Sequence, residues 1–175
     1  MVDSNPAVVQ KAEDLVREAE GLISEILRPG RWPQAATVER FLEGNRLERV
    51  LSLYSAAMEL DPSEPSYPWN LASTLSRLGL NDLALAFIER ALRVGRDVDP
   101  DEWDTPGSYL AWADTAIAAG QYDVALIPIA HALRANGSDP ALVESARKLV
   151  REIGRKKQIK DPPAELAEEL RRVPN

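Results

Sequence analysis

Carboxylates are the most closely spaced reactive side chains in this chain, and they gather in the segment Asp97–Asp104. Alternating carboxylate oxygens suit a hard cation such as Ca²⁺. A calcium loop, however, needs a glycine where Glu102 stands and a closing glutamate where Ser108 stands. We therefore expect a solvated acidic loop here, with Trp103 folded back onto apolar surface or offered as a secondary partner contact.

Catalytic chemistry has no visible constellation elsewhere in the chain. Cysteine is absent, and the single histidine, His131, has no second metal ligand and no plausible serine partner. No glycine-rich phosphate loop occurs, and the paired carboxylates fall on faces that we expect to be solvated. We therefore expect a protein that is not an enzyme, with no catalytic residues, no metal and no cofactor.

Charge and hydropathy narrow the class of partner. The net charge is −7, which disfavours a general nucleic-acid surface, and the basic run Arg155–Lys160 has no interleaved aromatic residues. No segment approaches 18 consecutive apolar residues, and no signal peptide is evident. We expect a cytoplasmic protein that contacts neither nucleic acid nor membrane.

The elements that would position a binding site repeat along the chain. Similar residues recur first after 34 positions and then after 41, which is the signature of stacked copies of one helical unit. The three series are Asn45, Gly79 and Gly120; Val50, Ala84 and Ala125; and Ala57, Ala91 and Ala132.

This register divides the chain into consecutive parts. Residues 1–30 form an amphipathic helix that begins at Asn5-Pro6 and packs on the first repeat or, alternatively, self-associates as a short coiled coil. Residues 31–153 hold three helical hairpins followed by a capping helix, and residues 154–175 are a basic linker and a short last helix. The predicted hairpins are 31–64, 65–98 and 106–139, and the predicted capping helix is 140–153.

These hairpins resemble the tetratricopeptide repeat (TPR) family, although Thr37 and Val38 depart from its pattern. The matching residues are Phe41, Tyr54, Ala57 and Pro62; Asn70, Leu71, Ala72, Leu75, Gly79, Ala84 and Ala91; and Tyr109, Ala113, Gly120, Ala125 and Ala132. The resemblance implies an all-α fold: a right-handed α-solenoid of three TPR hairpins between an N-terminal helix and C-terminal capping helices.

Such families bind partner segments in a concave groove lined by the first helix of each repeat. Carried over by register, the resemblance implies a partner-binding groove that includes Glu39, Leu42, Trp69, Ser73, Arg77, Leu110, Asp114 and Ile117. Because this set mixes apolar side chains with acids, we expect a protein or peptide partner with apolar anchors and some positive charge.

Two TPR subgroups can be compared directly. The carboxylate clamp that grips acidic chaperone tails retains only Asn70 here, so we reject that function. The segment Glu64–Trp69 resembles an opening found in chaperones of type III secretion translocators, although it falls in the middle repeat rather than the last.

Two functions therefore remain open. The first is a protein-binding module, acting as an adaptor or secretion-type chaperone. The alternative is a structural or oligomeric subunit, possible as a homodimer, that assembles through the N-terminal helix. Partner identity does not follow from the sequence.

Overall fold

The computed structural model describes residues 5–27, 33–136 and 139–157, and within these ranges every regular element is helical. By their internal contacts, residues 1–98 and 99–175 form two units, and each is described by itself. The predicted all-α class is thus confirmed for the part of the chain that the structure describes. None of the helices described is long and apolar enough to cross a membrane.

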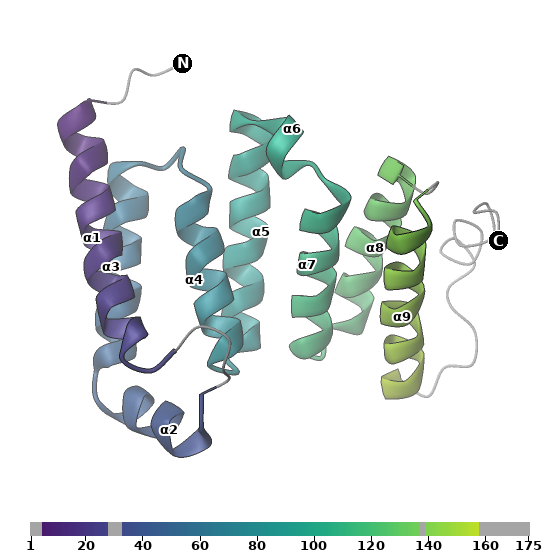
Figure 1. Cartoon of the computed structure of the whole chain (residues 1–175), viewed down its shortest axis with the longest axis horizontal. Coiled ribbons are helices and arrows are strands. Elements are labelled where there is room, and N and C mark those ends of the chain that lie inside the picture. Colours follow the sequence, from purple (N-terminus) through teal and green to yellow (C-terminus); the bar gives the residue numbers. More distant parts are fainter. Residues whose placement is uncertain (1–4, 28–32, 137–138, 158–175) are drawn as a thin grey trace. The chain divides into compact units, whose positions relative to one another are not determined.

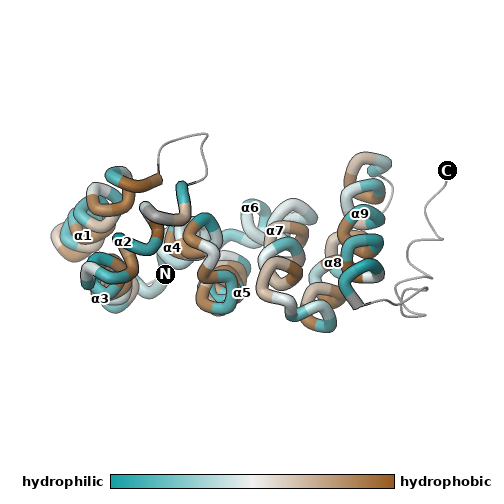
Figure 2. The backbone as a smooth tube through the Cα atoms, turned by 90° about the horizontal axis from the view of Figure 1, so that it is seen from below, coloured by the Kyte–Doolittle hydropathy of each residue, from teal (hydrophilic) through white to brown (hydrophobic). Residues whose placement is uncertain are grey.

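The described residues of the first unit form five helices, four of which pack as two pairs (Figure 1). α1 lies along α3 and α4 lies along α5, whereas the short α2 contacts α3 much less extensively. Each of the four paired helices has a hydrophobic and a hydrophilic side (Figure 2). The bounds are α1 Pro6–Ser24, α2 Ala35–Glu43, α3 Arg46–Leu60, α4 Ser66–Arg77 and α5 Asn81–Val98.

The first pair differs from the pairing that the 34-residue register predicts. That register joins the helix near 33–43 to the helix near 47–60, but α3 has its main partner in α1. The physical reason is apolar area: α1 buries Ala12, Val16, Ala19 and Ile23, while α2 has only nine residues. The N-terminal helix therefore acts as the first member of a hairpin-like pair.

The turn residues confirm the register itself. Asn45, Gly79 and Gly120 have φ angles of 54°, 78° and 73°, and no other described residue has a positive φ. This left-handed conformation is open to glycine and costs asparagine little, so each of these residues lets the chain reverse before the next helix.

Small residues pack the helix pairs closely, as the register predicts. Ala57, Ala84, Ala91, Ala125 and Ala132 are fully buried. A larger side chain at any of these sites would force two backbones apart.

The second unit is a helical pair with a closing helix. α7 packs along α8, and α9 contacts both. Thr105 caps α7 by accepting a hydrogen bond from the Ser108 N–H (3.3 Å), and Asp139 caps α9 by accepting one from the Ala141 N–H (2.9 Å). The bounds are α6 Pro100–Trp103, α7 Pro106–Ala118, α8 Tyr122–Asn136 and α9 Pro140–Lys157.

Two predicted segments of this unit are changed by the structure. The acidic segment contains a helical turn, α6, which is capped by the Asp99 carboxylate accepting a hydrogen bond from the Glu102 N–H. The closing helix α9 continues to Lys157, so it includes the start of the predicted basic linker. The predicted last helix within 158–175 lies outside the described residues.

Candidate functional site

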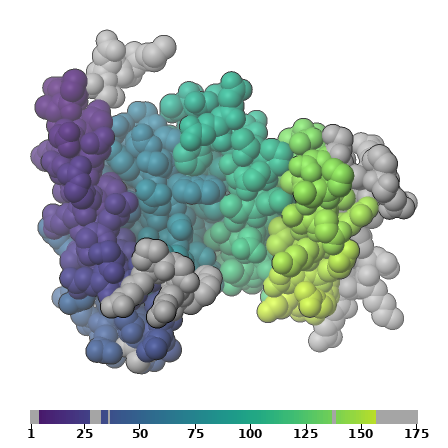
Figure 3. Space-filling model, viewed as in Figure 1, coloured from purple at the N-terminus to yellow at the C-terminus, as the bar shows by residue number. Residues whose placement is uncertain are grey.

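A cavity of about 300 Å³ opens between α1 and α4, with α3 beneath it. We call it the α1–α4 groove. In the space-filling view, α1 forms a purple ridge along one side of the first unit (Figure 3). The lining residues are Glu20, Ile23, Ser24, Leu27, Tyr54, Asn70, Ser73, Thr74 and Arg77.

The α1 side of the groove is one helical face and its extension. Glu20, Ile23, Ser24 and Leu27 recur at helical spacing, so their side chains stack on the same side. Ile23 and Leu27 are buried in the core of the unit, whereas Glu20 and Ser24 are exposed. This wall therefore presents polar groups above an apolar base.

The α4 side repeats that spacing with polar residues. Asn70, Ser73, Thr74 and Arg77 lie on one face of the helix, and its opposite side holds α4 against the core. The start of α4 is fixed by Glu64, whose carboxylate accepts a hydrogen bond from the Ser66 N–H at 2.9 Å. An amide, two hydroxyls and a guanidinium are thereby aligned along one wall.

Tyr54 of α3 contributes to the floor of the groove. Its side chain is 1% exposed, and its pKa is raised, first by burial and then by the nearby carboxylate of Glu20. The phenol therefore remains protonated at neutral pH and can act as a hydrogen-bond donor or acceptor.

The groove combines polar and apolar groups. Glu20 supplies one carboxylate and Arg77 one guanidinium, and the remaining polar groups are neutral. Asn70 can both accept and donate, which matches the N–H and C=O groups of an extended peptide backbone. The arrangement suits recognition of a chain segment.

Only part of the predicted set lies together in this groove. Ser73 and Arg77 line it. Trp69 is a half-buried residue of the same helix outside the lining, while Glu39 and Leu42 are exposed on α2 and also outside it. A binding role for these three residues remains a prediction.

The other predicted residues belong to the second unit. Ile117 is buried, and the half-buried Leu110 packs against Tyr109, Ala132 and Leu142. Asp114 is exposed on the surface of the second unit. The pKa of Asp114 is raised by partial burial and by Glu152, while Lys148 opposes this shift. Partner contact through these residues also remains a prediction.

Trp103, in the acidic segment, is the predicted secondary contact and is not one of the predicted groove residues. Trp103 is half-buried at the end of α6. Within 5–27, 33–136 and 139–157, no group of three or more His, Asp or Glu residues could hold a metal ion. A secondary partner contact at Trp103 remains a prediction.

The register missed the α1 residues Glu20, Ile23, Ser24 and Leu27. The available signal was the long apolar stripe of α1, which includes Ile23. That stripe predicts a helix that packs on the first repeat, but it does not show that α1 forms one wall of a groove. Tyr54 matches the repeat pattern, and its place in the groove depends on α1.

Comparison with known proteins supports the fold. A solved structure of the N-terminal domain of stress-induced protein-1 (STI-1) from C. elegans is similar, with a TM-score of 0.59 and 18% sequence identity. The match covers 83% of this chain and 98% of that chain. No protein-family model and no curated protein matches the chain. At this identity the likeness shows the fold alone, so the chain has an all-α, TPR-like fold.

Proposed function

We propose that this chain is a protein-interaction module that holds an extended segment of a partner protein in the α1–α4 groove. The observation that carries the proposal is the pair of facing helical walls over Tyr54. A backbone can be held by Asn70 and the hydroxyls, while a side chain enters the space between the helices.

The size of the groove sets the expected affinity. About 300 Å³ accommodates one or two apolar side chains, each contributing roughly 1.5–3 kcal/mol. A micromolar complex needs about 8 kcal/mol. Hydrogen bonds of about 0.5–1.5 kcal/mol each must therefore supplement the apolar anchors, which favours a ligand with an exposed backbone.

The charge of the partner is the finer part of the proposal. Glu20 is the groove carboxylate that a partner's Lys or Arg would meet, and Asp114 of the second unit is a further candidate. A cytoplasmic adaptor or a secretion-type chaperone would both use such a groove. The resemblance of Glu64–Trp69 to translocator chaperones gains no support from the comparison, which bears on the fold alone. In the structure, Glu64 fixes the start of α4, and Tyr67 and Pro68 are buried.

The alternative, a homodimer or larger assembly formed through the N-terminal helix, has weaker support. The apolar face of α1 is already buried against α3 within the same chain. A coiled coil through that face would require α1 to detach and to expose the core of the first unit.

Peptides selected from a random display library on the full-length chain provide the test. We expect Ser73→Arg to weaken their binding at least about tenfold, because the long side chain fills the groove. Ser55→Arg is the matched control, since Ser55 is also an exposed helical serine of this unit and lies outside the lining. Fluorescence anisotropy measures binding, and circular dichroism checks that helicity is unchanged. Equal binding by wild type and Ser73→Arg would sink the proposal.

The extension of the groove to the other predicted residues needs its own variants. Trp69→Ala and Leu110→Ala should each weaken the same peptides if these side chains serve as anchors. Unchanged affinity in both would confine binding to the α1–α4 groove.

A further inference from the structure

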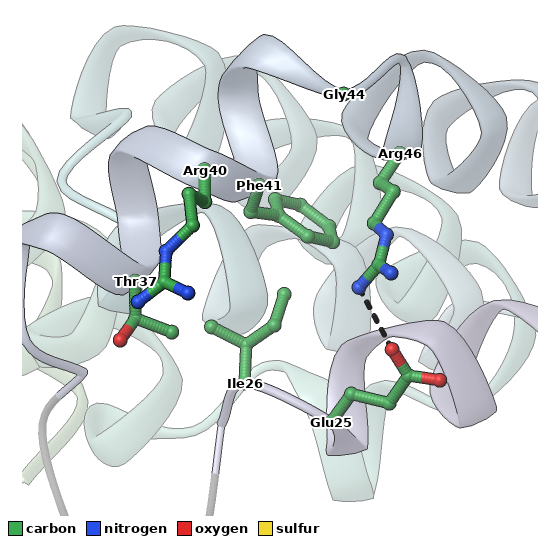
Figure 4. Close-up of a pocket in the computed structure, with 7 residues that line it drawn as sticks. All are labelled: Glu25, Ile26, Thr37, Arg40, Phe41, Gly44 and Arg46. Atoms are coloured by element: carbon green, nitrogen blue, oxygen red, sulfur yellow. Dashed lines mark hydrogen bonds and ion pairs between the residues drawn. The ribbon is translucent and has the colours of Figure 1, made fainter.

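A second cavity, of about 460 Å³, lies beside the C-terminal end of α1, on a different side from the α1–α4 groove. It is lined by the end of α1, by α2 and by the start of α3, and it shares no residue with the α1–α4 groove. Figure 4 shows Phe41 and Ile26 between the side chains of Arg40 and Arg46. The cavity thus has an apolar base between two guanidinium groups.

Glu25 shows which group this cavity can hold. Its carboxylate accepts a hydrogen bond from Arg46 at 2.7 Å (Figure 4). Both side chains of the pair are about half exposed (51% for Arg46 and 57% for Glu25), so the contact contributes little and can be exchanged for another carboxylate. A guanidinium matches the planar geometry of a carboxylate, which it binds with paired hydrogen bonds.

The charges in the lining discriminate between anions. Arg46 and Glu25 carry opposite charges, so the charge of Arg46 is balanced by a single carboxylate. A carboxylate that takes the place of Glu25 keeps the charge of Arg46 balanced, whereas a phosphate dianion exceeds it and is repelled more strongly by Glu25. Phe41 is already buried, whereas Ile26 is half-buried beside these groups, so an apolar body next to the carboxylate gains contact with Ile26.

We propose that this cavity is a second recognition site, which binds an acidic segment of a partner protein. An Asp or Glu side chain of that segment takes the place of Glu25 at Arg46, and an adjacent apolar side chain covers the exposed part of Ile26. The proposal is independent of the α1–α4 groove, because no residue is shared. It also assigns α2 a role: the short helix supplies Arg40 and Phe41.

Hydrocinnamate is a suitable probe, since it joins a carboxylate to an apolar ring. Titration into the full-length protein, followed by amide NMR, should shift the signals of Thr37, Phe41, Gly44 and Arg46. The neutral isostere hydrocinnamamide should bind at least about fivefold more weakly, because it lacks the charge. Equal shifts from both compounds, or shifts centred on other residues, would overturn the proposal.

Three variants sharpen the test. Arg46→Gln should weaken hydrocinnamate at least about fivefold, and Glu25→Gln should tighten it about two- to fivefold by removing the internal competitor. Arg49→Gln is the matched control, because Arg49 is in the same helix, forms an equally exposed ion pair with Glu18 and lies outside the cavity. Wild-type affinity in Arg46→Gln, or weaker binding in Glu25→Gln, would contradict the assignment.

Two other occupants would be recognised in the same experiment. Tighter binding of phenyl phosphate than of hydrocinnamate would assign the cavity to phosphate and overturn the carboxylate proposal. Shifts of the same signals with protein concentration, without added probe, would assign it to contact between copies of this chain and would likewise overturn it.

Discussion

The two hairpin-like pairs of the first unit use similar packing but different connections. α4 and α5 are joined by a tight turn at Gly79, whereas α1 and α3 are separated by residues 25–45, which include α2. Both pairs bury small and branched apolar residues along their shared length. The longer connection therefore has a structural role, because its residues line the 460 Å³ cavity, for which the tight turn at Gly79 has no counterpart residues.

The largest test of this comparison is truncation of a buried side chain in each pair. Leu75→Ala in α4 should lower the free energy of unfolding by about 2–5 kcal/mol, because Leu75 is fully buried. Ile23→Ala in α1 should fall in the same range, since α1 is an equal partner of its pair. Urea denaturation measures both. A loss below about 1 kcal/mol for Ile23→Ala would return α1 to the role of a loosely flanking helix.

Alkaline pH should destabilise both pairs. The pKa of Tyr54 in α3 is raised by burial and then by Glu20, and burial, with Asp61 the next largest cause, raises the pKa of Tyr67 in α4 to about 12. A raised tyrosine pKa means that the unfolded chain ionises first, so stability is lost as pH rises above about 10.

At pH 11 the Tyr54→Phe variant should therefore have a free energy of unfolding about 1 kcal/mol higher than wild type, once the difference between the two proteins at pH 7 is subtracted. Tyr67→Phe should give a gain of similar size between pH 10 and 11, because the folded-state pKa of both tyrosines lies above this range. Denaturation curves at the two pH values measure both gains. An identical pH dependence in wild type and Tyr54→Phe would contradict the raised pKa of Tyr54.

Substitutions in the turns should have an effect of similar size. Gly79→Ala should lower the free energy of unfolding by about 1–2 kcal/mol, because alanine is strained at a φ of 78°. The added methyl group meets no neighbouring atom, so no steric clash adds to this cost. Asn45→Gly should instead be neutral or stabilising by a few tenths of a kcal/mol, since it removes the strain of a side chain at a φ of 54°. Thermal denaturation checks both signs; a destabilised Asn45→Gly would show that the asparagine side chain contributes contacts of its own.

The smallest effect is expected for the surface ion pairs that join α1 to α3. Arg49→Gln breaks the 2.6 Å contact with Glu18, and both side chains are exposed. The loss of stability should be at most about 0.5 kcal/mol and should vanish at high salt. A loss that persists in concentrated salt would indicate packing by the arginine stem.

Much of the fold could be predicted from local sequence signals. The three left-handed turn residues and the buried alanines have backbone requirements that act at single positions, so their spacing gives the register. The caps at Asn5, Thr105 and Asp139 are equally local. Each of these features needs only a few neighbouring residues to be recognised.

The site was less predictable because it depends on which helix packs against α3. Periodicity shows that α1 and α2 both have apolar faces, but the choice between them is decided by the total area buried after folding. α1 is 19 residues long and α2 only nine, so α1 buries more apolar area and is the main partner of α3. Glu20 and Ser24 consequently line a groove that the repeat register had assigned to Glu39 and Leu42.

The length of the connection between α1 and α3 also bears on the order of folding. Because of lost conformational entropy, closing the loop of residues 25–45 costs about 1–2 kcal/mol more free energy than closing the turn at Gly79. The α4–α5 pair can therefore form early from contacts near in sequence, and α1 docks onto α3 afterwards. During synthesis the apolar face of α1 therefore stays uncovered until α3 has emerged from the ribosome. In that interval α1 is open to binding by chaperones or to pairing with a wrong helix.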